Sequence, residues 1–130
     1  MAVFFNKIQR SDPRNPVGLR KWFLILKSLS TRRTKEVAQR MADETTMNPK
    51  EAEMALYELV KVMKNILKEG CTVQIDDLGT FYLTGNSSAS DTKEEVTAHN
   101  CEAIHIRFRP DKALQAEINK VQLKPIDKLL

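Results

Sequence analysis

The sequence predicts an α+β fold in which a pair of strands comes first, two helices follow, and an antiparallel sheet and a short helix complete the order. Three observations lead to this prediction. Apolar residues recur at intervals of three and four over residues 34–67, as on one face of a helix. They alternate with polar residues over 73–83 and over 104–108, as in a half-buried strand. Glycine, proline, asparagine and aspartate separate these segments.

The first thirty residues predict two strands joined by a loop. Residues 1–9 and 21–29 are rich in Val, Phe, Trp, Ile and Leu, and the loop Ser11–Gly18 between them holds two prolines and a glycine. The segment Trp22–Leu26 is apolar on both faces, so as a strand it needs cover on both sides or a place in an interface. A short buried helix would show the same pattern.

Two helices are expected next. The first begins at Thr34, its available N-cap, and places four apolar residues on one face: Val37, Ala38, Met41 and Ala42. The second has Asn48 as N-cap, Pro49 at its first position and Glu51 to complete a capping box. It ends at Gly70, and its apolar face is too wide for one neighbour to cover. A second subunit and a fully wrapped single chain are equally good ways to cover this face.

Two strands joined by a tight turn follow the second helix. The turn is Asp76–Gly79, and the apolar positions of the two strands are Val73, Ile75, Phe81 and Leu83. Residues 84–103 form a polar stretch with no strong core signal.

A third strand and a short helix come last. Ile104, Ile106 and Phe108 share one face of the strand, and the opposite face carries His105, Arg107 and Arg109. Asp111 then caps a helix that runs to Val121. Residues 121–130 are expected to form a tail after Pro125 ends any helix.

Composition is that of a globular protein, with 42% hydrophobic and 29% charged residues. The net charge of +4 favours nucleic acid only mildly. The longest apolar run, Trp22–Leu26, is far shorter than the roughly 18 residues of a membrane helix, and the N-terminus shows no secretory signal. We therefore expect a cytoplasmic protein with no membrane contact, whose Cys71 and Cys101 are buried, free thiols.

No arrangement of residues predicts catalysis. The chain has no Gly-x-Ser-x-Gly elbow, no Cys/His pair with an orienting partner, and no glycine cluster for phosphate groups. Four residues that zinc favours are present but match no standard spacing: Cys71, His99, Cys101 and His105. The expectation is no enzyme, no cofactor, no metal site and no small-molecule substrate.

Three short motifs stand at fixed places in the predicted fold. They are Lys68-Glu69-Gly70, Leu78-Gly79-Thr80-Phe81 and Phe108-Arg109-Pro110-Asp111-Lys112-Ala113-Leu114. Together with the order of helices and strands, they resemble the histone-like HU and integration host factor family of DNA-binding proteins. The N-terminal strand pair resembles a divergent branch of that family.

The resemblance implies three parts: an N-terminal β extension over 1–30, an HU-like domain over 31–120, and the tail. The HU-like fold is a two-helix hairpin followed by an antiparallel three-stranded sheet with a β-arm and a C-terminal helix. It further implies a nucleoid-associated homodimer that binds double-stranded DNA with little sequence preference, through phosphate neutralisation and duplex deformation.

The resemblance also assigns DNA contacts to basic residues. Arg109 and Lys112 match the family's basic positions around the Phe-x-Pro motif, and Arg107 extends the same strand face. They flank a helix start whose free amide groups suit a phosphate. The family places another phosphate contact near the start of the first helix, where this chain has Arg32, Arg33 and Lys35. For each residue, a merely solvated surface charge is the alternative.

The expected arm departs from the family pattern. In HU the arm carries several arginines and an Arg-Asn-Pro tip whose proline wedges between base pairs. Here residues 84–103 contain no proline. Their one basic residue, Lys93, is the expected DNA contact of the arm, and it stands against Asp91, Glu94, Glu95 and Glu102. Phosphates repel such an arm, so binding through the body and the extension, with weak bending, is expected. The alternative function is an HU-fold interaction or assembly module that has lost DNA bending.

Overall fold

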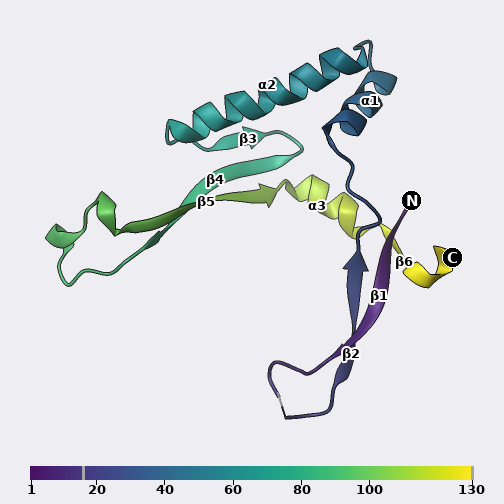
Figure 1. Cartoon of the computed structure of the whole chain (residues 1–130), viewed down its shortest axis with the longest axis horizontal. Coiled ribbons are helices and arrows are strands. Elements are labelled where there is room, and N and C mark those ends of the chain that lie inside the picture. Colours follow the sequence, from purple (N-terminus) through teal and green to yellow (C-terminus); the bar gives the residue numbers. More distant parts are fainter. Residues whose placement is uncertain (16, 130) are drawn as a thin grey trace. The chain divides into compact units, whose positions relative to one another are not determined.

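The computed structural model describes residues 1–15 and 17–129, and the chain divides into two compact units (Figure 1). The first unit comprises residues 1–33 and 117–130, and the second comprises residues 34–116. Pro16 and Leu130, which fall in the expected loop and tail, lie outside the described residues. The two ends of the chain therefore belong to one unit, and the helix pair with its sheet forms the other.

The N-terminal strand pair that the sequence predicts is present. β1 (Ala2–Arg10) and β2 (Lys21–Lys27) are antiparallel, with seven residue pairs in register that end at Arg10 and Lys21. Because side chains alternate along a strand, β2 places apolar side chains on both faces: Trp22, Leu24 and Leu26 on one, Phe23 and Ile25 on the other. We call β1, β2 and the loop between them the N-terminal hairpin.

The C-terminal residues add a third strand to this sheet. β6 (Gln122–Pro125) pairs in parallel with β1, which gives the order β2-β1-β6, and the short helix η3 (Ile126–Leu129) follows. The sequence predicts only a tail over 121–130, and the structure differs because the partner of β6 lies at the other end of the chain, where no local pattern can reveal it. Pro125 ends the strand at a sheet edge, where a missing N–H is tolerated.

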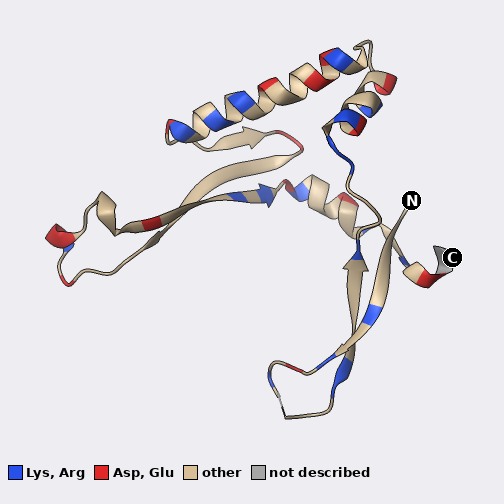
Figure 2. Ribbon diagram, in the orientation of Figure 1, with Lys and Arg blue, Asp and Glu red and all other residues tan. Residues whose placement is uncertain are grey.

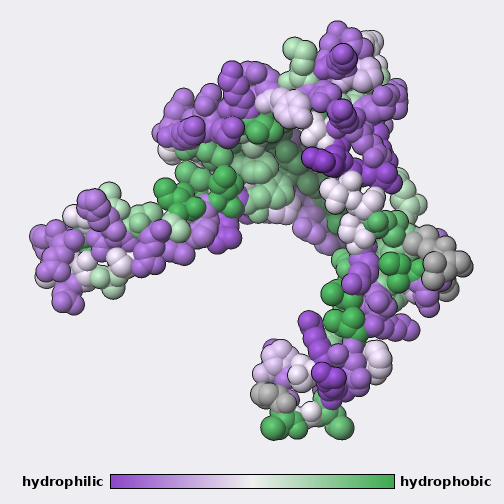
Figure 3. All heavy atoms as spheres, viewed as in Figure 1, coloured by the Kyte–Doolittle hydropathy of each residue, from purple (hydrophilic) through white to green (hydrophobic). Residues whose placement is uncertain are grey.

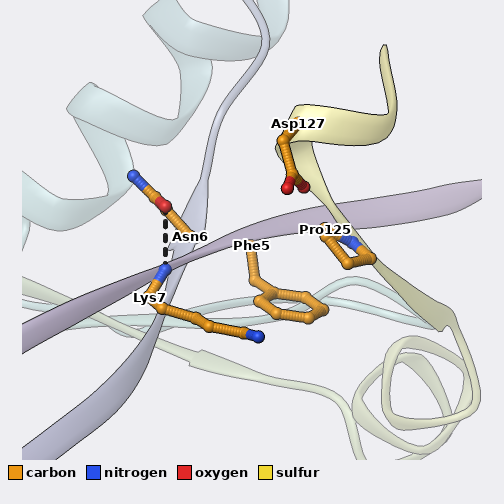
Figure 4. A pocket seen from close by; sticks show the side chains of 5 residues that line it. All are labelled: Phe5, Asn6, Lys7, Pro125 and Asp127. Carbon is orange, nitrogen blue, oxygen red and sulfur yellow. Dashed lines mark hydrogen bonds between the residues drawn. The ribbon is translucent and has the colours of Figure 1, made fainter. Parts of the chain in front are cut away.

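A pocket lies where β1 meets the C-terminal residues (Figure 4). Phe5 and Pro125 are register partners, so their rings lie on the same side of the sheet and line the pocket together. Both are half-buried. This cross-strand pair gives the short strand β6 an apolar contact with β1 in addition to its backbone hydrogen bonds.

In the second unit, α1 (Thr34–Glu44) and α2 (Pro49–Lys68) pack against each other. The capping box of α2 is complete, because Asn48 Oδ1 accepts a hydrogen bond from Glu51 N at 2.9 Å and Glu51 Oε2 accepts one from Asn48 N at 3.3 Å. Gly70 follows the helix with a φ of 84°, a value that glycine adopts without strain. Ala38 and Ala52, one from each helix, are almost fully buried.

The second sheet contains β3 (Val73–Ile75), β4 (Gly79–Ser87) and β5 (Cys101–Pro110), antiparallel in that order. In the turn before β4, Leu78 N donates to Ile75 O at 3.1 Å and Asp77 has a φ of 66°. Gly79 has a φ of 149°, and a Cβ there would collide with the Arg109 carbonyl oxygen. Only glycine therefore allows β5 to pass this close to β4.

β4 and β5 continue beyond Leu83 and Ile104, where the apolar alternation stops, and form an arm in the segment 84–103, where the resemblance implies one. Their pairing runs to Ser87 and Cys101. The tip holds two short helices, η1 (Lys93–Glu95) and η2 (Ala98–Asn100). Asn100 Nδ2 donates to Ser90 Oγ at 3.0 Å and to Ser88 O at 3.3 Å, which joins the two sides of the tip. Backbone pairing and polar contacts hold the outer part of the arm together, so apolar alternation in the sequence does not predict it.

Few apolar side chains are buried within one chain. Among the described residues, the buried hydrophobic ones are Ala38, Ala52, Leu67 and Val73. The apolar face of β4 and β5 is exposed instead, at 40% for Leu83, 68% for Ile104, 64% for Ile106 and 45% for Phe108. Figure 3 shows hydrophobic side chains gathered on this part of the second unit. The second unit therefore has an apolar surface that a single chain leaves uncovered.

Candidate nucleic-acid interface

Two arginines of β5 lie on the same face of the second sheet. Arg107 and Arg109 are register partners of Tyr82 and Thr80 on β4, and the apolar residues of β5 between and before them face the other way. The Arg109 guanidinium carbon lies 5.6 Å from the centroid of the Tyr82 ring, within the range of a cation–π contact. Both arginines are exposed, and their partners across the ladder are uncharged. The face therefore presents two accessible cationic side chains.

Lys112 is the first residue of α3 (Lys112–Asn119), which follows β5 directly. Asp111 caps this helix, because its Oδ2 accepts a hydrogen bond from Ala113 N at 3.0 Å. One amide group that the sequence assigns to a phosphate is therefore already taken by a carboxylate. The side chains of Arg107, Arg109 and Lys112 remain, and we call these three residues the β5 basic strip (Figure 2).

The other predicted residues near helix α1 belong to both units. Arg32 and Arg33 precede the helix in the first unit, whereas Lys35 lies in its first turn in the second. All three are exposed. The three cations therefore lie on the surface in consecutive segments of the chain, and no single helix or strand carries them all.

Lys93 lies apart from the β5 basic strip. It is in η1 at the tip of the arm, directly followed by Glu94 and Glu95. The strand from Arg107 to Cys101 alone spans roughly 20 Å at about 3.3 Å per residue. Figure 2 shows acidic residues around this tip. The structure therefore does not bring Lys93 together with the other predicted residues of the second unit.

Sequence reasoning misses Tyr82, whose ring lies beside Arg109. The signal that could have found it is an aromatic residue on the polar face of a strand, between Phe81 and Leu83, which lie on the opposite, apolar face. The register of β4 against β5 is also needed, because only the register shows that Tyr82 and the arginines share a face.

Other kinds of site receive no support from the part of the chain that the structure describes. There, no three His, Cys, Asp or Glu side chains gather to hold a metal ion, and no helix combines the length and the hydropathy that crossing a membrane requires. Cys71 and Cys101 are free thiols, as predicted, but they are exposed and not buried. Cys71 lies in the connection between α2 and β3, and Cys101 lies at the start of β5 on the arm, where no residue from 84 to 103 is buried.

A family model covers nearly all of the sequence. The model HU-HIG, described as an HU domain fused to a wHTH, Ig or glycine-rich motif, matches residues 1–125. The chain belongs to the HU-HIG family. The match includes the N-terminal hairpin as well as the second unit, and it confirms the HU likeness that the sequence motifs indicate.

Among solved structures, the HU-HIG chain is similar to "a Putative bacterial DNA binding protein from Bacteroides vulgatus ATCC 8482". The TM-score is 0.69 at 13% identity, over 96% of this chain and 48% of the other. The chain therefore spans about half the length of the protein that it matches, and at this identity the likeness shows the fold alone. No curated protein matches the sequence.

Proposed function

We propose that this HU-HIG protein is a histone-like DNA-binding protein, associated with the nucleoid, that binds duplex DNA as a homodimer with little sequence preference. The observation that carries the proposal is the β5 basic strip on an HU-type sheet: Arg107, Arg109 and Lys112 are exposed on consecutive elements, and Tyr82 lies beside one guanidinium.

Phosphate contacts account for the low sequence preference. Guanidinium groups bind phosphate oxygens with two parallel hydrogen bonds, and the backbone of every duplex offers the same phosphates. Arg109 is held beside the Tyr82 ring, so less of its rotamer freedom is lost when it binds. The released counterions supply much of the affinity, which makes binding sensitive to salt.

The uncovered apolar surface supports the homodimer. Leu83, Ile104, Ile106 and Phe108 lie on one face of β4 and β5, and each is at least 40% exposed. α2 exposes Met54, Tyr57 and Val60 by 55% or more. A second copy that brings the same two surfaces would bury them in a shared core, as a symmetric interface requires.

Charge reversal tests the proposed interface. In the double variant R109E/K112E, two cations of the strip become anions, so we expect affinity for a linear duplex to fall at least about tenfold in a gel shift. The matched control is K50E/K64E, two charge reversals at exposed positions of α2, so that both variants change the net charge by the same amount. Equal losses in both variants would show that only net charge matters and would overturn the assignment of the strip.

The same variant separates this function from an assembly module. A protein that assembles with partners and does not bind DNA would keep its partners in a pull-down after the R109E/K112E change, and its wild type would give no gel shift. Neither comparison favours that alternative, because the family model describes an HU domain and the similar structure is named a DNA binding protein.

A further inference from the structure

The N-terminal hairpin concentrates positive charge. Between Ala2 and Lys27 there is one acidic residue, Asp12, against six basic ones: Lys7, Arg10, Arg14, Arg20, Lys21 and Lys27. All six are exposed (Figure 2). Arg10 and Lys21 are register partners at the end of the ladder, so two like charges stand opposite each other. Such a pair destabilises strand pairing, and an anion placed between the two side chains relieves the repulsion.

The end of this hairpin is apolar as well as basic. Val17 and Leu19 are 97% and 90% exposed, and Figure 3 shows hydrophobic side chains at this end. The loop around them has its own hydrogen bonds: Arg14 N donates to Asp12 Oδ1 at 2.9 Å, and Gly18 N donates to Asn15 O at 3.0 Å. Two large apolar side chains are thus held in water on a turn with internal hydrogen bonds, next to arginines.

This combination has a specific use on DNA. Proteins that bend DNA through the minor groove place Arg or Lys along the groove and insert an apolar side chain, leucine among them, between base pairs.

We propose that the N-terminal hairpin is the element that enters the minor groove. Arg10, Arg14, Arg20 and Lys21 contact the phosphates on both sides, and Leu19, with Val17, is inserted at a base step and kinks the duplex. This inference rests on the proposed DNA binding and adds a second contact site to the β5 basic strip. The strip holds the duplex, and the hairpin bends it.

The arm of β4 and β5 is the competing element, and its charge opposes this use. Its tip carries Asp91, Glu94 and Glu95 against Lys93, and its exposed apolar residue is Val96, at 53%. Phosphates repel this tip and attract the hairpin. The hairpin end and the arm tip therefore carry charges of opposite sign, but both expose apolar side chains. The arm tip can therefore serve as the control when the apolar side chains of the hairpin are replaced.

Bending is measured by energy transfer between dyes at the two ends of a short duplex that is saturated with protein. In the variant V17S/L19S the apolar side chains are lost and every charge stays, so we expect the wild-type change in transfer to fall by at least about half, with affinity within about threefold. The control V96S, in the arm, should bend DNA as the wild type does. Normal bending by V17S/L19S, or a loss in V96S alone, would overturn the proposal.

The fluorescence of Trp22 can report directly whether DNA contacts the hairpin. Trp22 is the chain's single tryptophan, is 67% exposed, and lies next to the Arg10–Lys21 pair in the ladder. We expect DNA to quench its fluorescence in the wild type and in R109E/K112E at protein concentrations that still give a gel shift, and to quench it much less in R14E/R20E. A gel shift with unchanged Trp22 fluorescence would overturn the hairpin site and leave the strip intact. Absence of any gel shift by the wild type would overturn both.

Discussion

At the scale of single residues, Arg109 connects the fold to the proposed function. Its carbonyl oxygen occupies the space beside Gly79, and its guanidinium lies beside Tyr82. The alternation of residues 104–109 was enough to predict that Arg107 and Arg109 share a face, because a strand repeats every two residues. The partner Tyr82 could not be predicted, since alternation within one strand says nothing about the register of its neighbour.

Gly79 gives the sharpest stability prediction at this scale. Gly79→Ala should lower the free energy of unfolding by about 1–3 kcal/mol, because the residue has a φ of 149° and an added Cβ collides with the backbone of β5. Urea unfolding at a fixed protein concentration measures the change.

Gly85→Ala is the matched control on the same strand. A Cβ at Gly85 would lie 3.6 Å from Ala103 O and from Cys101 Sγ, an ordinary contact, so the change should stay within about 0.5 kcal/mol. Similar effects of the two substitutions would contradict the account of the turn.

At the scale of elements, those defined by neighbouring residues could be predicted from the sequence, whereas those defined by pairing with a distant segment could not. The start of α2 was predicted residue by residue, because a cap, a proline and a glutamate within four positions define it without help from the rest of the chain. β6 was missed because its partner is β1 at the opposite end. Apolar alternation alone did not predict the outer half of the arm, because this part is polar and is held by backbone pairing and by Asn100; only the resemblance implied an arm there.

The cap of α2 can be tested alone. Asn48→Ala removes the acceptor for Glu51 N, so the free energy of unfolding should fall by about 1 kcal/mol. Asn65→Ala, at an exposed position inside the same helix, should leave stability unchanged or raise it slightly, since alanine is the better helix former. A larger loss from Asn65→Ala than from Asn48→Ala would contradict the capping interpretation.

At the scale of the whole molecule, the sequence predicted the HU likeness but left open how the wide apolar faces are covered. The structure of one chain leaves them exposed, with Ile104 and Ile106 both above 60%. Charge is also divided between elements, since the hairpin is basic and the tip of the arm is acidic. The charge of each element can be predicted from the sequence. The apolar end of the hairpin could not be predicted, because it is recognised only from the exposure of Val17 and Leu19 in the structure.

If the protein forms the proposed homodimer, its mass in solution is fixed at twice that of one chain. Light scattering at micromolar concentration should give twice the 14.9 kDa mass of the chain. Ile106→Asp places a carboxylate on the apolar face of β4 and β5, where burial of an unpaired charge is unfavourable, and should shift the protein toward monomer. A wild-type protein that stays monomeric would contradict the shared core.

Binding to DNA through phosphate contacts is the central claim, and equilibrium titration of a linear duplex over a range of salt concentrations tests it most directly. The wild type should bind at about 50 mM salt and lose affinity steeply as the salt concentration rises. In the variant R107Q/R109Q, the slope of log affinity against log salt should be smaller by about 0.9 for each phosphate contact removed. Absence of binding at about 50 mM salt, or an affinity that salt does not change, would contradict it.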